Sequence, residues 1–333
     1  MKNINVLSTK LVFWLVSFII GSIVQSVSAQ SYPTKSIRLV VGFASGGPND
    51  MAARIVGHKL TESLGVPVII DNRPGANSMI GMQITARAVP DGYTIAMISA
   101  SATSNVSASA TANPNVFTDV SINLLKDFTS ITLVASGVFV LIINPSLQVR
   151  TVKDLILLAK DKPGQLNFAS AGLGSSLHLA GELFKSLAHV DINHVPYKGG
   201  APAVTDVVTG QVQMMFSPLA VAMPHVRSSK LIALAVTSAK RSDLVPELPT
   251  ISESGVPGYE ATGWYGIIGP AGLPNVVLNK LNREIVKSIG NTDVKKQFAK
   301  LDLEPIGNKP EEMKLHLQTE LVKWAKVVKD AKL

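Results

Sequence analysis

Two glycine-containing segments hold the residues best suited to bind a ligand. They are GFASGGPND, from Gly42 to Asp50, and ASAGLGSSLHL, from Ala169 to Leu179, called here the first and second glycine turns. Each lies between a strand-like apolar run and a helix-like pattern. Glycine permits positive φ angles and close approach of a ligand, and a helix start presents unpaired N–H groups at its positive dipole end. The pair predicts two anion-binding turns.

Backbone donors of this kind suit a carboxylate. Hydrogen bonds to a charged group contribute roughly 1.5 to 3 kcal/mol each, so four or five converging donors could hold one without lysine or arginine. Pro48 suits a helix start, because the first helical position needs no N–H bond. The simpler alternative is that Gly46, Gly47, Gly172 and Gly174 only form tight connections, since glycine is a common turn residue.

The sequence lacks the complete motifs for dinucleotide binding, serine catalysis and metal binding. Gly172, Gly174 and Leu177 follow the GxGxxG pattern except that leucine replaces the third glycine, which argues against a dinucleotide site. Phe43 stands where the GxSxG motif around Ser45 would need its first glycine. The six histidines show no HExxH spacing and the chain has no cysteine, so we expect no metal site and no cofactor.

The elements that must position these turns alternate along the chain. From Ile37, short β-branched runs alternate with helical patterns, which is typical of βαβ units and a largely parallel sheet. Strands are predicted over 37–43, 66–70, 94–99, 130–136, 138–144 and 166–170, and the last helices near 276–289, 293–301 and 310–332. We expect Gly65 to end the first helix in a left-handed cap and Thr151 to begin another with Asp154 as an imperfect capping-box partner.

One polar stretch does not fit this alternation. The residues from Ala100 to Asn115 are mostly serine, alanine, threonine and asparagine, without periodicity. Such a length without a pattern predicts either a functional loop over a cleft or a poorly ordered connection.

The amino terminus has the three-part plan of a secretory signal. Lys2 and Lys10 precede an apolar run, and small residues lead to a predicted cleavage after Ala29. The apolar run is shorter than the roughly 20 residues that a membrane-spanning helix needs. Removing the two lysines changes the net charge from +8 to +6, which suits anionic ligands. Scattered basic residues and 5% aromatics argue against nucleic-acid binding.

Several motifs together resemble a known family. They include IRLVVGFASGGPNDMAAR, VIIDNRPGANSMIG, AVPDGYT, LNFASAGLGSSLHLAGELF, INHVPYKGGAPAVTDVVTGQVQMMF and PELPTISESGVPGYEATGWYG. The chain is similar, from Tyr32 nearly to its end, to the substrate-binding component of tripartite tricarboxylate transporters, the Bug-type or TctC-like receptors. The resemblance implies an α/β, two-lobed periplasmic binding protein of type II-like fold. Each lobe would be a mostly parallel sheet flanked by helices, with the ligand cleft between lobes.

The resemblance also implies the bounds of the two lobes and the residues of the binding site. Residues 31–129 and 238–333 would form one lobe and 130–237 the other. Asp50 is assigned to capping the first helix, and Tyr197 either walls the pocket or packs. The expected ligand-binding residues are Phe43, Ala44, Ser45, Gly46, Gly47, Asn49, Asn77, Ser78, Ser99, Ser101, Ser170, Ala171, Gly172, Gly174, Ser175, Ser176 and Tyr197. Ser217 and Pro218 follow Phe216, where family members often have a carboxylate, which argues against an amino-acid ligand.

We therefore expect a non-enzymatic periplasmic receptor. It would capture a small di- or tricarboxylate or aromatic carboxylate by lobe closure, as a monomer, for tripartite transporter subunits or a sensor kinase. Two other classes of function stay open. One is a periplasmic hydrolase or isomerase with Ser45 or Ser175 as nucleophile, and the other is a structural envelope protein.

Overall fold

The computed structural model describes residues 32–111 and 122–331. The predicted signal peptide and its cleavage after Ala29 lie outside the described residues. Residues Lys35–Leu333 form one compact unit. Within the described ranges, no helix has both the length and the apolar character needed to cross a membrane.

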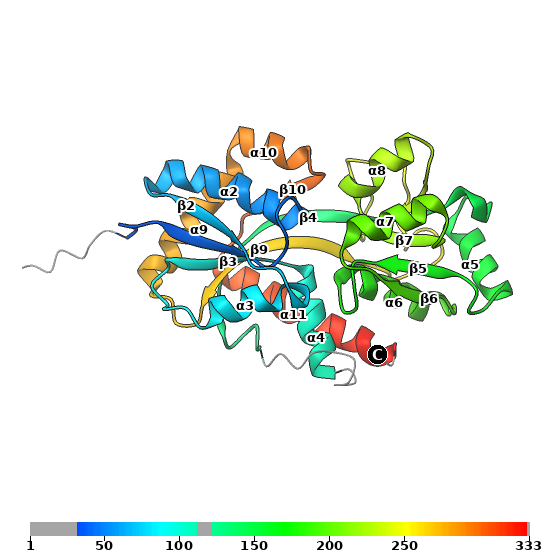
Figure 1. Ribbon diagram of the computed structural model, residues 1–333, viewed down its shortest axis with the longest axis horizontal. Coiled ribbons are helices and arrows are strands. Elements are labelled where there is room, and N and C mark those ends of the chain that lie inside the picture. Colours follow the sequence, from blue (N-terminus) through cyan, green and yellow to red (C-terminus); the bar gives the residue numbers. More distant parts are fainter. Residues whose placement is uncertain (1–31, 112–121, 332–333) are drawn as a thin grey trace, which may run out of the picture. The chain divides into compact units, whose positions relative to one another are not determined.

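A first sheet is built around three parallel strands. The strands β1 (Ile37–Val41), β2 (Val68–Asn72) and β3 (Thr94–Ser99) lie in the order β2-β1-β3, followed by the antiparallel β9 (Thr262–Pro270) and β4 (Phe128–Ile143). The short β10 (Leu303–Pro305) pairs with β4. The accompanying helices are α2 (Pro48–Leu64), α3 (Met79–Ala86), α4 (Ala100–Thr111), α9 (Asn275–Gly290), α10 (Thr292–Ala299) and α11 (Pro310–Asp330), with the 3-10 turn η1 (Ala76–Ser78) before α3 (Figure 1).

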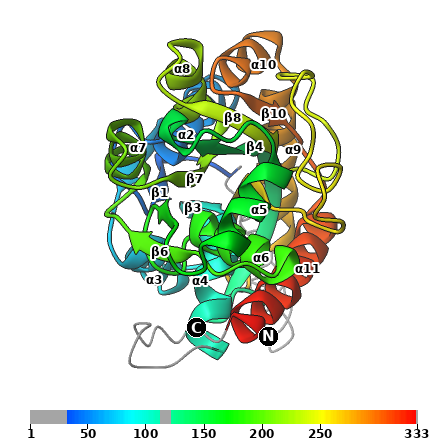
Figure 2. The same cartoon turned by 90° about the vertical axis from the view of Figure 1, so that its right-hand side faces the viewer.

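A second sheet continues from the far end of β4. Here β4 pairs with β7 (Met214–Pro218) and β8 (Ile232–Val236), and β5 (Asn167–Ser170) runs parallel to β6 (Asn193–Pro196) and β7. Its helices are α5 (Val152–Asp161), α6 (Ser176–Ala188), α7 (Gly200–Thr209) and α8 (Leu219–Arg227), with the 3-10 turn η2 (Pro145–Leu147) before α5 (Figure 2).

Alternate residues of the second sheet face opposite sides, as the two-residue period of a strand requires. Leu141 and Phe216 belong to a buried cluster with α5 and α6, whereas Val140 and Met215 belong to a cluster with α7 and α8. The strand pairs of β1–β3 and β5–β7 are parallel, and every antiparallel pair involves β4 or β9. The predicted two-lobed α/β fold is confirmed, with mixed sheets because β4 takes part in both.

The predicted strands over 130–136 and 138–144 are one continuous strand, β4. Ser136 and Gly137 stay in the ladder, paired with Trp264 and Gly263. Glycine fits this place because a Cβ on Gly137 would lie 2.9 Å from Leu303 of β10. Polar and glycine residues inside an apolar run therefore marked a close approach of strands, not a turn.

The polar stretch after Ser99 begins with the helix α4, so the expected irregular loop is wrong as far as Thr111. Thr103 and Ser104 donate hydroxyl hydrogen bonds to the carbonyl of Ala100, which satisfies these buried side chains inside the helix. Small side chains also let α4 lie close to α11, where Ser107 donates to the carbonyl of Leu321. Packing against α11 therefore stabilises α4, although its sequence lacks the periodicity of an amphipathic helix.

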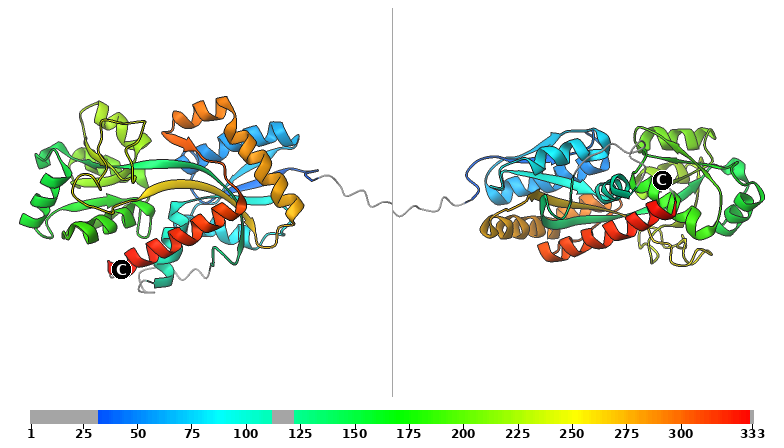
Figure 3. Two further views of the ribbon diagram at one scale, coloured as in Figure 1. Left: turned by 180° about the vertical axis from the view of Figure 1, so that it is seen from behind. Right: turned by 90° about the horizontal axis from the view of Figure 1, so that it is seen from below.

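The carboxyl-terminal helix α11 packs against both sheets (Figure 3). Its residues Met313 and Leu317 pack in the cluster of the first sheet, and Trp324 and Val328 pack in that of the second. Tyr259 also packs with the second sheet. The lobe bounds of 31–129 with 238–333 and of 130–237 stay a prediction, because these shared residues join the lobes into one compact unit.

Candidate ligand-binding site

A cavity of about 1000 Å³ is lined by loops that follow strands of both sheets. The first sheet contributes the first glycine turn, the turn before α3 and the start of α4. The second sheet contributes the second glycine turn and the loop before α7. The strand β9 adds Gly263, Trp264 and Tyr265.

Most of the predicted binding residues line this cavity. They are Phe43, Ala44, Ser45, Gly46, Gly47, Asn49, Asn77, Ser78, Ser99, Ser101, Ala171, Gly172 and Ser176. Ser170, Gly174, Ser175 and Tyr197 lie outside the lining and form hydrogen bonds that support it. Contact of any of these residues with a ligand stays a prediction.

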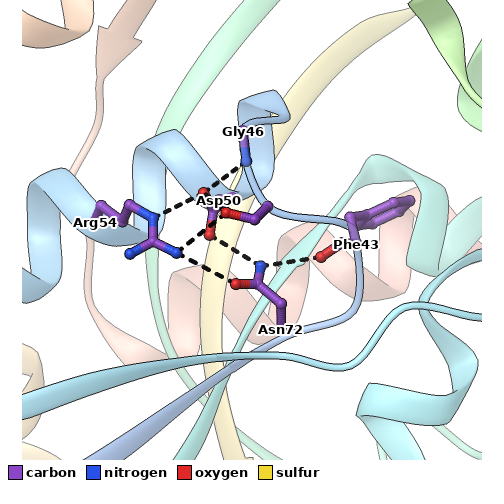
Figure 4. A network of polar contacts seen from close by, with 6 residues as sticks. Phe43, Gly46, Asp50, Arg54 and Asn72 are labelled. Carbon is purple, nitrogen blue, oxygen red and sulfur yellow. Dashed lines mark hydrogen bonds and ion pairs between the residues drawn. The ribbon is translucent and has the colours of Figure 1, made fainter.

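The first glycine turn is held by the carboxylate of Asp50 (Figure 4). Its Oδ2 accepts hydrogen bonds from the Gly46 N–H at 2.9 Å and from Arg54 Nε at 2.8 Å. Asn72 Nδ2 donates to Asp50 Oδ1 at 2.9 Å and to the Phe43 carbonyl at 3.0 Å. Burial alone would raise the pKa of Asp50, but the hydrogen bonds from Arg54, Gly46 and Asn72 outweigh it and lower the pKa to about 2.

The expected capping role of Asp50 takes a different geometry. The N-cap of α2 is Gly47, and Asp50 is the third residue of the helix, where its carboxylate reaches back to Gly46 instead. Pro48 has no N–H, and no side chain in the described ranges forms a cap hydrogen bond to this helix. The N–H groups of Asn49 and Asp50 therefore have no acceptor among the described residues, and the helix start borders the cavity.

In the second glycine turn, the N–H groups of the two glycines donate to side chains of nearby residues. Gly172 N–H donates to Ser170 Oγ at 3.1 Å, and Gly174 N–H donates to His178 Nδ1 at 3.1 Å. The φ angles of 132° and 74° at these glycines favour glycine over other residues. Ser175 caps α6 by accepting from the His178 N–H at 3.2 Å. Ser176, the first residue of α6, remains as the polar residue of this helix that lines the cavity.

A histidine pair lies behind the second turn. The rings of His178 and His194 stack with centroids 3.8 Å apart, and His194 Nε2 is 2.6 Å from Ser170 Oγ. Burial, then the nearby His194 and Lys185, lower the pKa of His178 to about 2, while burial and Lys185 lower the pKa of His194 to about 4. Both rings are therefore neutral at neutral pH, and His178 can accept from Gly174.

The turn before α3 has an unusual backbone. Three consecutive non-glycine residues, Ala76, Asn77 and Ser78, have φ angles of 44°, 51° and 78°. Such left-handed conformations cost free energy and cluster at functional sites. The buried Nδ2 of Asn77 and Oδ1 of Asn49 have no hydrogen-bond partner among the described residues. A buried donor and a buried acceptor are thus unsatisfied beside the same cavity.

Tyr197 packs rather than lining the cavity. Its hydroxyl donates to Asp206 Oδ2 at 2.6 Å. Burial, the hydrogen bond to Asp206 and its negative charge raise the pKa of Tyr197 to about 12. The tyrosine therefore fixes the start of the loop that leads into α7.

Sequence reasoning missed several lining residues. Gly42, Pro48, Leu173 and Leu177 belong to the two predicted glycine turns but were not named as binding residues. The lining residues outside these turns that were missed are Pro74, Gly75, Ala76, Ala100, Asn105, Phe139, Lys198, Gly199, Gly200, Ala201, Pro202, Pro218, Val221, Gly263, Trp264 and Tyr265. A signal existed for the loop KGGAP at 198–202, which also joins a strand to a helix through glycines. No local signal marks the apolar residues, because each is one of many apolar residues in its element.

The contacts of Ser45 and Ser175 bear on the enzymatic alternative. Ser45 Oγ lies 3.4 Å from Asp50 Oδ2 and from Arg54 Nη2, and Ser175 Oγ caps α6. Neither hydroxyl hydrogen-bonds to a histidine ring in the described part of the chain. Residues 32–111 and 122–331 contain no cluster of three or more histidine, aspartate or glutamate residues able to hold a metal ion.

A family comparison identifies the family to which this chain belongs. The model of the tripartite tricarboxylate transporter family receptors matches residues 52–333. The chain belongs to this family. BugT of Bordetella pertussis is 34% identical over 310 residues, which cover 93% of each chain.

Solved structures of similar proteins agree with this assignment. The R. palustris protein Rpa4515, described with adipate, has a TM-score of 0.79 and 34% identity, covering 90% of this chain and 98% of its own. MatC of Rhodopseudomonas palustris, described with bound malate, has a TM-score of 0.78 and 28% identity, covering 89% of this chain and 100% of its own. The chain is therefore a family receptor with the two-lobed fold of solute-binding proteins.

Proposed function

We propose that this receptor acts in the periplasm as a monomer, without catalysis, and binds a small carboxylate for a tripartite transporter or a sensor kinase. The observation that carries the proposal is the uncapped start of α2 at the cavity. The N–H groups of Asn49 and Asp50 have no acceptor within residues 32–111 and 122–331, and the helix dipole there favours an anion. Ser176 at the start of α6 would supply a donor from the opposite sheet.

The size and polarity of the cavity support a small organic anion. Its volume of about 1000 Å³ exceeds what one carboxylate group needs. Phe139, Leu177, Val221 and Trp264 provide apolar wall for the body of a ligand. The similar proteins Rpa4515 and MatC are described with adipate and malate, which are both carboxylates.

A binding experiment tests this proposal. We expect adipate, malate or another small carboxylate to raise the melting temperature of the chain that begins at Gln30, with saturation in calorimetry. A ligand at about 100 times its dissociation constant should add roughly 2.7 kcal/mol to the free energy of unfolding. Adipamide, which has the length of adipate without its charge, is the control. Equal stabilisation by adipamide, or none by any carboxylate, would contradict the proposal.

The same samples test the enzymatic alternative. We expect NMR spectra of the bound and recovered ligand to show no product after prolonged incubation. Turnover of a carboxylate ester that disappears in Ser45→Ala or Ser175→Ala would instead establish a hydrolase.

A further inference from the structure

The loop before α7 brings one cation to the cavity. Lys198 follows β6 and precedes Gly199, the N-cap of α7. It is the one charged residue among the described residues that line the cavity. No carboxylate in the described part of the chain forms an ion pair with it. Its side chain is exposed and can therefore pair with a ligand.

The backbone of Lys198 is fixed from both sides. Tyr197 N–H donates to the Ser170 carbonyl at 3.1 Å, and Gly199 N–H donates to the Ala171 carbonyl at 3.1 Å. Tyr197 is also anchored through its hydroxyl to Asp206. These bonds tie the residues on either side of Lys198 to the second glycine turn, so the ammonium group extends from a defined point of the cavity rim.

We infer that Lys198 is a specificity-determining residue that pairs with a second anionic group of the ligand and selects dicarboxylates over monocarboxylates. This inference rests on the proposed function. One carboxylate would lie at the uncapped start of α2, and the body of the ligand would lie along apolar wall. A second carboxylate left unpaired in such a wall is strongly disfavoured, and Lys198 offers the required opposite charge.

The test compares acids of matched length. Dissociation constants are measured for succinate, adipate and suberate, and for butyrate, hexanoate and octanoate, which have the same chain lengths and one charge. In the unmodified chain we expect the best diacid to bind at least ~10-fold more tightly than its monoacid, as one charge-assisted pair would give. The chain length with the largest preference then reports the distance from the α2 start to the lysine.

Variants assign the preference to Lys198. In Lys198→Met, which keeps the apolar stem, we expect the diacid preference to fall to within about threefold while monoacid affinity changes little. Lys198→Arg should retain most of the preference, because it keeps the charge. Lys230→Met is the matched control, since Lys230 is exposed and does not line the cavity. Added salt should reduce the preference in the unmodified chain but not in Lys198→Met.

The outcomes separate the two claims. A diacid preference that persists in Lys198→Met, or equal binding of both acids in the unmodified chain, would overturn the role of Lys198 and leave carboxylate binding intact. Binding of neither acid series, and of no other carboxylate, would overturn the proposed function and this inference with it.

Discussion

The hydroxyl oxygens of Ser101 and Ser176 lie 3.3 Å apart, within hydrogen-bond distance. Ser101 belongs to the start of α4, which follows the first sheet, and Ser176 is the first residue of α6, which follows the second. The two residues are 75 positions apart in the chain, and both line the cavity. A direct polar contact thus joins the two sides of the proposed binding site.

This contact predicts energetic coupling across the site. A neutral hydrogen bond contributes about 0.5–1.5 kcal/mol, so Ser101→Ala should weaken carboxylate binding by roughly 3- to 10-fold. In a double-mutant cycle with Ser176→Ala, the two effects on binding should not add. Ser104→Ala is the control, because the Ser104 hydroxyl donates to Ala100 of the same helix and Ser104 is not among the residues that line the cavity. Fully additive effects in the cycle would show that the contact makes no contribution.

Replacing Asn77, which has a left-handed backbone, should lower ligand affinity without lowering stability. Asn77→Gly removes the side-chain amide, which has no partner in the described part of the chain, and glycine adopts a φ of 51° without strain. We expect ligand affinity to fall by about 5- to 10-fold, the effect of one hydrogen bond, while the melting temperature stays the same or rises. Ser229→Gly, at a φ of 56° outside the cavity, is the matched control and should leave affinity unchanged. Unchanged affinity in Asn77→Gly would exclude the amide from binding.

The buried carboxylate of Asp50 predicts an acid-dependent contribution to stability. Its folded pKa of about 2 lies below the value of 3.8 for the free group, so the ionised form stabilises the fold above pH about 4. That contribution is lost as pH falls from about 4 toward 2. Asp50→Asn should lower the free energy of unfolding by about 1–3 kcal/mol at pH 7, because Arg54 and Gly46 lose a charged acceptor.

Denaturant unfolding at several pH values measures this contribution. The difference in free energy of unfolding between the unmodified chain and Asp50→Asn should become smaller as the pH approaches 2. The exposed Asp161, which forms no ion pair with the described residues, gives the control Asp161→Asn, for which little change is expected. A difference that is independent of pH would contradict the proposed ionisation of Asp50.

The tryptophans predict a fluorescence signal for binding. Trp264 lines the cavity, and its Nε1 donates to Glu320 Oε2 at 3.2 Å. Trp324 donates to the same oxygen at 2.8 Å but does not line the cavity. We expect ligand to change the emission mainly through Trp264, so the change should persist in Trp324→Phe and disappear in Trp264→Phe. A change that disappears only in Trp324→Phe would place the ligand elsewhere.

Some features of the site follow from the sequence because their causes are local. Gly65 ends α2 with a φ of 70°, and Thr151 and Asp154 form a capping box, as their residue types predict. The two glycine turns follow β1 and β5 for the same reason, since φ preferences and strand or helix periods act over a few residues. The sequence by itself therefore determined the family, the alternation of elements and the two glycine turns that line the cavity.

Other features were decided only by the tertiary structure. α4 forms from a stretch without periodicity because it is buried against α11. The N–H of Gly174 donates to His178, whereas the N–H of Asn49 has no acceptor in the part of the chain that the structure describes. The glycine pattern predicts neither. Lys198 and Trp264 reach the cavity because backbone bonds to the second turn and the course of β9 bring them there. Which donors remain free, and which side chains surround a cavity, depends on partners distant in the chain, and only the packed fold brings those partners together.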